Sequence, residues 1–340
     1  MDKNEIVKII ENLDEENPIK IFKDKKFTNE LVANLENLND IDLNKIKTLM
    51  CGNSKYSTFL YNQGIAELFI YFLLNKQNIT FCTEENENNS NSSNVDVSFE
   101  FKDIKFNIEV KSPEYNLPSE NKLSGSFANR FGNKKDNYLM MKNFSEKLKK
   151  NITGTKYEDV ETLNLTDNKV KDCLLSAQNK FAEPTKTNFN ILFLCTTTEE
   201  MESYWQYIVN PNSGFFNENS DVSSFFADKN QTIQLKKEMY NKVSAIVLSN
   251  AITLNERRTE QSWNIDNAIT LVLANPFSNY KNMDQYRILD SFFKNNTFDF
   301  CNGLCKFEKE NPGTPDIIYF YEFVSSKDYD VNEEKKINKE

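Results

Sequence analysis

The clearest hydrophobic pattern in the chain lies in residues 95–111, VDVSFEFKDIKFNIEVK. Apolar residues occupy every second position of its first half, and then, after a shift of one, every second position of its second half. An alternation with a period of two is typical of strands that bury one face. The pattern predicts two strands, 95–101 and 104–111, paired as a tight hairpin closed by Lys102-Asp103.

This hairpin brings charged residues together on its polar face. If the strands pair around Lys102-Asp103, facing residues have numbers that add to 205, and Asp96 lies directly opposite Glu109. Lys111 is two residues further along and shares the face. Lys-Asp is not a favoured hairpin turn, and an odd loop length would place Asp96 opposite an apolar residue. The clean alternation of both strands favours the even register.

The polar face has two interpretations. Charged residues on the solvent side of an antiparallel strand are ordinary, so the face is either a solvated surface or a site. Two carboxylates at this distance repel each other unless a positive charge lies between them. Magnesium binds one or two carboxylates together with waters and substrate phosphates. The second interpretation therefore predicts a Mg²⁺ site, in which Mn²⁺ can substitute, at Asp96 and Glu109, with Lys111 beside it.

The rest of the chain predicts helices and strands in a mixed order. Short amphipathic helices are expected before residue 50, and the strongest helix pattern spans 57–75. Further helices are expected at 137–151, 168–182, 199–209 and 283–295, and further strands at 79–82, 190–196, 243–250, 268–277 and 316–323. This mixture indicates an α/β or α+β fold around one central sheet.

Composition excludes several classes of site. The 340 residues include no histidine, which removes Ser-His triads and histidine-ligated zinc, and none of the six cysteines forms a CxxC pair. The net charge of -10 argues against a surface coated for nonspecific nucleic-acid binding. No apolar run is long enough to span a bilayer, so we expect a soluble, cytoplasmic protein with no membrane association.

One segment departs from this acidic balance. Residues 101–150 contain eleven Lys and Arg against six Asp and Glu, a local charge of +5. They form either a solvated face or a surface that contacts phosphates. The candidates for phosphate contact are Lys122, Arg130, Lys134 and Lys135.

The arrangement of an acidic residue, a hairpin and then Glu-x-Lys resembles the PD-(D/E)XK nuclease superfamily. The residues that carry the resemblance are Asp96 and Glu109-Val110-Lys111, while Val95 stands where the family has its proline. Glu67 lies in an apolar helix before the sheet, where the family often has a glutamate; otherwise it lies on an exposed helix edge. The resemblance covers residues 57–197.

The resemblance implies a restriction-endonuclease-like αβββαβ core with a mixed sheet flanked by helices. It divides the chain into an N-terminal helical region (1–56), the core (57–197), a C-terminal α/β extension that continues the sheet or serves recognition or dimerisation (198–327), and a charged tail (328–340). The implied ligands of the metal are Asp96, Glu109 and the Val110 carbonyl. Lys111 would position or activate water, and Glu67 would assist through metal-bound water.

The same resemblance suggests Gln178 and Lys180 as auxiliary residues, although a solvated helix face is the more ordinary explanation of them. The expected function is a Mg²⁺-dependent endonuclease acting on DNA as a homodimer, of restriction or phage-defence type. Two alternatives stay open: a nucleic-acid-binding or assembly subunit that keeps the fold without cleaving, and a metal-free structural protein. For Arg257, Arg258 and Trp263 we expect a structural role.

Overall fold

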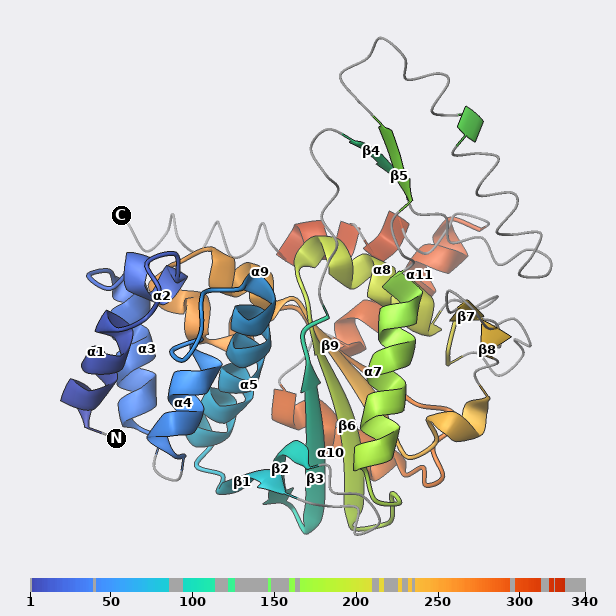
Figure 1. Ribbon diagram of the computed structural model, residues 1–340. Coiled ribbons are helices and arrows are strands. Elements are labelled where there is room, and N and C mark those ends of the chain that lie inside the picture. The colour runs from blue at the N-terminus through green and yellow to red at the C-terminus, as the bar shows by residue number, and fades with distance from the viewer. Residues whose placement is uncertain are drawn as a thin grey trace, which may run out of the picture.

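A six-stranded mixed sheet forms the centre of the protein, which we describe from a computed structural model (Figure 1). The strands lie in the order β1-β2-β3-β6-β9-β10. Neighbours are antiparallel from β1 to β3, parallel from β3 to β9, and antiparallel between β9 and β10. The strands span Phe81–Glu85 (β1), Val95–Phe101 (β2), Ile104–Lys111 (β3), Asn188–Cys195 (β6), Ala245–Ser249 (β9) and Thr270–Ala274 (β10).

Two short ladders lie outside this sheet: β4 (Lys122–Gly125) pairs with β5 (Asp159–Thr162), and β7 (Phe226–Ala227) pairs with β8 (Thr232–Ile233). The structure describes residues 2–38, 41–85, 94–113, 122–125, 146–147, 159–162, 166–209, 214–216, 226–227, 232–233, 236–293, 297–312, 318–320 and 322–327. Most of the predicted helix 137–151 lies outside these ranges.

The β2–β3 hairpin has the predicted register. Val97 faces Ile108, so the numbers of facing residues add to 205. Lys102 and Asp103 close the turn with φ angles of 51° and 62°. A type I′ turn requires two successive residues in this left-handed region, and its twist matches that of the paired strands. The even register therefore forms although the turn contains neither glycine nor asparagine.

Helices cover both faces of the sheet (Figure 1). One face carries α1 (Lys3–Glu11), α2 (Pro18–Ile21), α3 (Lys26–Glu36), α4 (Leu43–Leu49), α5 (Thr58–Lys76), α9 (Ala251–Glu256) and α10 (Met283–Phe293). The opposite face carries α7 (Thr166–Lys180), α8 (Thr198–Val209) and α11 (Thr297–Glu310). The protein is therefore an α/β protein with two hydrophobic cores, one on each side of a mixed sheet.

The two faces of β3 differ in chemistry. On β6, both faces are apolar: Ile191 and Phe193 enter the core beside α5, while Leu192 and Leu194 enter the core beside α7. On β3, only the even-numbered residues are apolar, and they face α5. The odd-numbered residues of β3 are polar and share the face that α7 covers, which places charged groups inside the fold.

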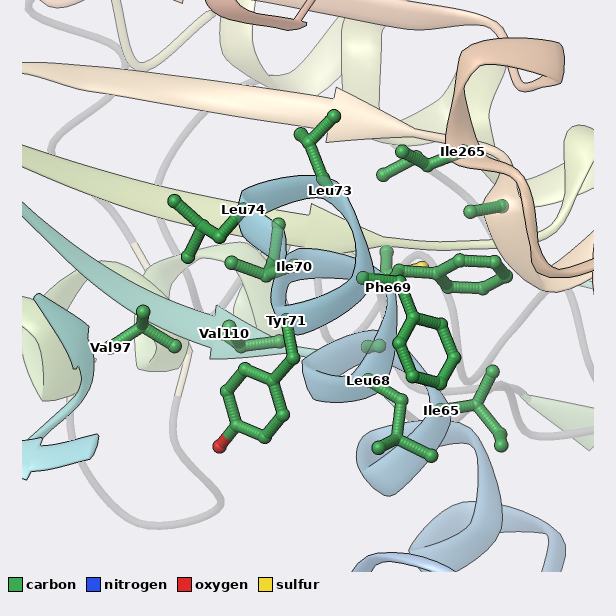
Figure 2. Packing of buried hydrophobic residues seen from close by; sticks show 14 of the residues in the cluster. Ile65, Leu68, Phe69, Ile70, Tyr71, Leu73, Leu74, Val97, Val110 and Ile265 are labelled. Atoms are coloured by element: carbon green, nitrogen blue, oxygen red, sulfur yellow. The ribbon is translucent and has the colours of Figure 1, made fainter. Parts of the chain in front are cut away.

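Helix α5 is buried around its whole circumference. Every residue of Gly64–Leu74 is buried, as expected of a helix that is apolar on all sides. A Cβ atom at Gly64 would lie 1.9 Å from the Leu49 carbonyl oxygen, so only glycine allows α4 and α5 to approach this closely. Figure 2 shows the side chains of α5 packed beside Val97 and Val110 of the hairpin.

Most predicted elements are present within a few residues of their expected ends. The predicted helices 57–75 and 168–182 are α5 and α7, and the predicted strand 190–196 is β6. The order α5-β1-β2-β3-α7-β6 thus contains a helix, three antiparallel strands, a second helix and a parallel strand. Strands β9 and β10 continue the sheet, one of the two arrangements expected for the C-terminal extension.

The last predicted strand, 316–323, is wrong. Residues 318–320 and 322–327 are helical. Phe320, Phe323 and Val324 are buried and are spaced by three and four residues, so this apolar run follows the helical period and packs beside Trp205 of α8 and Phe300 of α11. Aromatic and β-branched residues favour a strand in isolation, but tertiary packing decides here.

Candidate active site

Asp96 lies where the β2–β3 pairing ends. With a two-residue turn, the regular ladder would bond the Val110 N–H to the Val95 carbonyl. The Val110 N–H instead donates to Asp96 Oδ2 at 2.7 Å. The carboxylate therefore replaces a main-chain acceptor in the ladder, and the backbone of β3 fixes its orientation. Its side chain is 12% exposed, which leaves the other oxygen available to further partners.

Glu109 is the most deeply buried charged group of this site. Its side chain is completely inaccessible to solvent, and Oε1 lies 2.6 Å from Nζ of Lys111. The two residues are two positions apart on β3, which puts both side chains on the face covered by α7. Lys111 is 28% exposed, so the pair connects the interior of the sheet to its surface.

Lys180 joins the two carboxylates. It is the last residue of α7, and its Nζ lies 2.8 Å from Glu109 Oε2 and 3.5 Å from Asp96 Oδ1. A single ammonium group thus bridges the two acidic side chains that the hairpin brings together. The structure supports an ion-pairing role for Lys180 and not the alternative of a solvated helix face.

Glu67 is buried in α5, so an exposed helix edge does not explain it. Its Oε2 accepts a hydrogen bond from the Tyr71 hydroxyl at 3.1 Å and lies 3.1 Å from Lys45 Nζ. Lys45, on α4, also forms an ion pair with Glu84 at the end of β1. The charge of Asp96 is close enough to act on the Glu67 carboxyl.

Gln63, one turn before Glu67 on α5, was not predicted from the sequence. Its amide nitrogen donates to the Val110 carbonyl at 3.0 Å, and its carbonyl oxygen accepts from the Ser112 N–H at 2.9 Å. This pair of bonds holds the end of β3 on both sides of Lys111. A glutamine beside an apolar run suggests a partly buried amide that needs partners, but it does not say which residues those partners are.

The charged cluster consists of two groups of ion pairs. On the face that α7 covers, Asp96 and Glu109 pair with Lys111 and Lys180, while Glu67 of α5 pairs with Lys45, which also pairs with Glu84. Buried charges of this kind are stable only when they are paired, and removing one partner is costly. The cluster draws on α4, α5, β2, β3 and α7.

The environment shifts the pKa values of the buried groups. Burial, and then the charge of Asp96, raises the pKa of Glu109, although Lys111 and Lys180 act in the opposite direction. Burial and Asp96 likewise raise the pKa of Glu67. For Lys111, burial acts to lower the pKa, but the Glu109 carboxylate outweighs it and the net shift is upward. Lys111 therefore stays protonated at neutral pH.

The donor set of this cluster fits a hard cation. Both Glu109 oxygens are buried, and among the described residues their partners are the ammonium groups of Lys111 and Lys180. Asp96 supplies a second carboxylate, and the Val110 carbonyl, which accepts a hydrogen bond from Gln63, is a further oxygen of the same strand. No group of three or more His, Cys, Asp and Glu side chains within the described ranges is arranged to hold a metal. Two carboxylates are sufficient for Mg²⁺, which keeps several waters.

The remaining predicted residues lie elsewhere or are not described. Gln178 bonds to Asn241 and to the Lys242 N–H, so it ties α7 to the segment before β9 and is not part of the cluster. Lys122 begins β4, but its side chain lies outside the description. Arg130, Lys134 and Lys135 lie wholly outside the described residues.

Trp263 and Arg258 have the structural role that we expected. The Trp263 indole N–H donates to the Phe27 carbonyl at 2.8 Å, and its ring stacks on that of Phe27. Arg258 donates to the Tyr61 hydroxyl at 2.9 Å. These contacts attach the N-terminal helices to the segment after α9.

Comparisons with protein-family models, with characterised proteins and with solved structures find no match to this chain. Among the described residues, no helix is both long and apolar enough to cross a membrane. The charged cluster is thus the feature of the protein that bears on its function.

Proposed function

We propose that the protein is a Mg²⁺-dependent endonuclease that hydrolyses phosphodiester bonds in DNA, of restriction or phage-defence type. The observation that carries the proposal is the convergence of Asp96, Glu109 and Lys111, with Lys180 bridging the two carboxylates. Charged groups are costly to bury, so the direct ion pairs among Asp96, Glu109, Lys111 and Lys180 favour a site over a decorated surface.

The roles follow from the contacts. Asp96, Glu109 and the Val110 carbonyl would hold Mg²⁺, which supplies a water of lowered pKa and offsets negative charge on the phosphate. Lys111 is protonated, so it acts by orienting water and stabilising negative charge rather than by accepting a proton. Burial and the charge of Asp96 raise the pKa of Glu67, which is the direction that suits a proton acceptor.

Two features outside the cluster support a nucleic-acid substrate. The order of elements around the site, α5-β1-β2-β3-α7-β6, is the order that the PD-(D/E)XK resemblance implies. The segment that follows β3 carries the local excess of basic residues in an otherwise acidic chain. Cutting both strands of a duplex requires two such sites, so we propose a homodimer as the active form.

The test is incubation of supercoiled plasmid with the purified protein in Mg²⁺. We expect cleavage that EDTA abolishes and that Lys111→Met reduces by about three orders of magnitude. Cleavage of equal rate in all three reactions would show a contaminant and overturn the proposal.

The alternative is a nucleic-acid-binding subunit that keeps this fold without cleaving. An electrophoretic mobility shift with the same plasmid fragment in Ca²⁺ separates the two functions. Binding without cleavage in either Mg²⁺ or Mn²⁺ would favour this alternative. The complete set of carboxylates and lysines at the site argues against it.

A further inference from the structure

We propose that the ammonium group of Lys180 competes with the divalent cation for Asp96 and Glu109. In the absence of nucleic acid, it occupies the position between the two carboxylates that the cation needs. The inference rests on the proposed function, because it concerns how that site takes up its metal. Lys180 Nζ lies 2.8 Å from Glu109 Oε2 and 3.5 Å from Asp96 Oδ1, between the two carboxylates that would bind the ion.

The geometry distinguishes Lys180 from the other lysines of the cluster. Lys111 contacts Glu109, and Lys45 contacts Glu67 and Glu84. Of the ammonium groups described here, Lys180 is the one recorded in ion pairs with both Asp96 and Glu109. A cation that uses oxygen atoms of both carboxylates needs the region that this ammonium occupies, and the two positive charges repel at such a distance.

The position of Lys180 also allows its ammonium group to move away from Asp96 and Glu109. It is the last residue of α7, and its side chain is 21% exposed, whereas the Glu109 side chain is completely buried. Rotation of its flexible four-carbon side chain moves the ammonium toward solvent without moving the strands. The carboxylates stay in place, because the Val110 N–H holds Asp96 and because Glu109 projects from the centre of the sheet.

A displaced ammonium needs a new partner, and the phosphate groups of a nucleic acid provide one. Metal binding and nucleic-acid binding then favour each other, because each stabilises the state in which Lys180 has left the carboxylates. The site is thus expected to bind metal weakly in the free protein and more tightly in the complex.

The test measures Mn²⁺ affinity directly, by the electron paramagnetic resonance signal of free Mn²⁺ during titration of the nucleic-acid-free protein. We expect Lys180→Gln to bind Mn²⁺ at least about ten-fold more tightly than wild type, and Lys180→Arg, which keeps the charge, to bind as wild type does. Lys76→Gln is the matched control, since Lys76 pairs with Asp266 outside the site. It should leave the affinity unchanged.

Adding a short DNA duplex should tighten Mn²⁺ binding by wild type but not by Lys180→Gln. In EDTA, Lys180→Gln should have a lower Tm than wild type, because Glu109 loses a partner, and Mn²⁺ should reverse this loss. Lys180→Met serves as a second neutral variant if the glutamine does not fold.

The outcomes separate this inference from the proposed function. Equal Mn²⁺ affinity in wild type, Lys180→Gln and Lys180→Met, or weaker affinity in the neutral variants, would overturn the competition while leaving the nuclease proposal intact. Tighter Mn²⁺ binding by the neutral variants without any DNA cleavage by wild type would support the competition and overturn the nuclease. Absence of Mn²⁺ binding in every variant would overturn both.

Discussion

Two layers of polar side chains lie on the same face of β3. One consists of neutral amides, and the other consists of carboxylates and ammonium groups. At Asn107, the side-chain amide nitrogen donates to the side-chain Oδ1 atoms of Asn188 and Asn190 at 2.8 and 2.9 Å. Asn190 in turn donates to the carbonyls of Ala182 and Lys242. At Glu109, two residues further along β3 and on the same face, the partners are ammonium groups instead of amides.

The difference shows which buried polar groups indicate function. The asparagine layer is neutral, and its amides are tied mainly to one another and to the backbone, so it stabilises the joint between β3 and β6. The charged layer is held by flexible lysines, which in our proposal a metal ion displaces from the carboxylates and a phosphate then binds. Burial of polar groups is common to both layers, so the exchangeable partner is what distinguishes the candidate site.

The largest effect is expected from Lys111→Met, which removes the ammonium group beside Glu109. We predict an about 10³-fold lower single-turnover cleavage rate, or about 4 kcal/mol of transition-state stabilisation. Lys105→Met is the matched control, because Lys105 lies on the same face of β3 but pairs with Glu85. If both variants lose the same activity, the loss reflects the strand and not the site.

Asn190→Ala should have the next largest effect, but on stability alone. It removes the donor to two partly buried carbonyls and one of the two acceptors of the Asn107 amide, and we predict a loss of about 2–3 kcal/mol in the free energy of unfolding. Urea denaturation measures it. Asn311→Ala, at an exposed helix end, should cost less than about 0.5 kcal/mol. A reduced cleavage rate of folded Asn190→Ala would contradict the separation of the two layers.

Gln63→Leu tests whether the end of β3 must be held in place. The variant loses the bonds to the Val110 carbonyl and the Ser112 N–H. Because such supporting contacts orient ligands, we predict about ten-fold weaker Mn²⁺ binding and a similar loss of cleavage rate. Unchanged affinity with reduced stability would mean that Gln63 serves packing only.

The smallest effect on stability is expected from Glu67→Gln, and it should depend on pH. The folded pKa of Glu67 lies above its ordinary value of 4.5, so the contribution of this carboxyl to stability is complete below that value. It is lost as pH rises through the folded pKa. In EDTA, the Tm of wild type relative to Glu67→Gln should therefore fall by about 2 °C between pH 4 and 7. The Tm difference between wild type and Asn190→Ala should not depend on pH. If the Tm difference between wild type and Glu67→Gln is also the same at both pH values, the raised pKa of Glu67 is refuted.

The sequence was sufficient for the local part of the site. The alternation in 95–111 predicts the hairpin register, and that register alone brings Asp96 and Glu109 together. The PD-(D/E)XK resemblance, and not a local pattern, suggested Glu67 and Lys180. Lys45 and Gln63 could not be found in the same way, because their contacts depend on how α4 and α5 dock against the hairpin. No local pattern encodes that docking angle.

The close backbone contact between Gly64 and Leu49 makes the N-terminal helices a support for the charged cluster as well as a cover for the sheet. It fixes α4 against α5, and α4 carries Lys45, the cation that compensates Glu67. The first fifty residues are thus inseparable from the chemistry of a strand pair that begins more than forty residues later. A protein shortened to begin at α5 would expose the apolar surface that α4 covers and would leave the buried Glu67 carboxylate without Lys45.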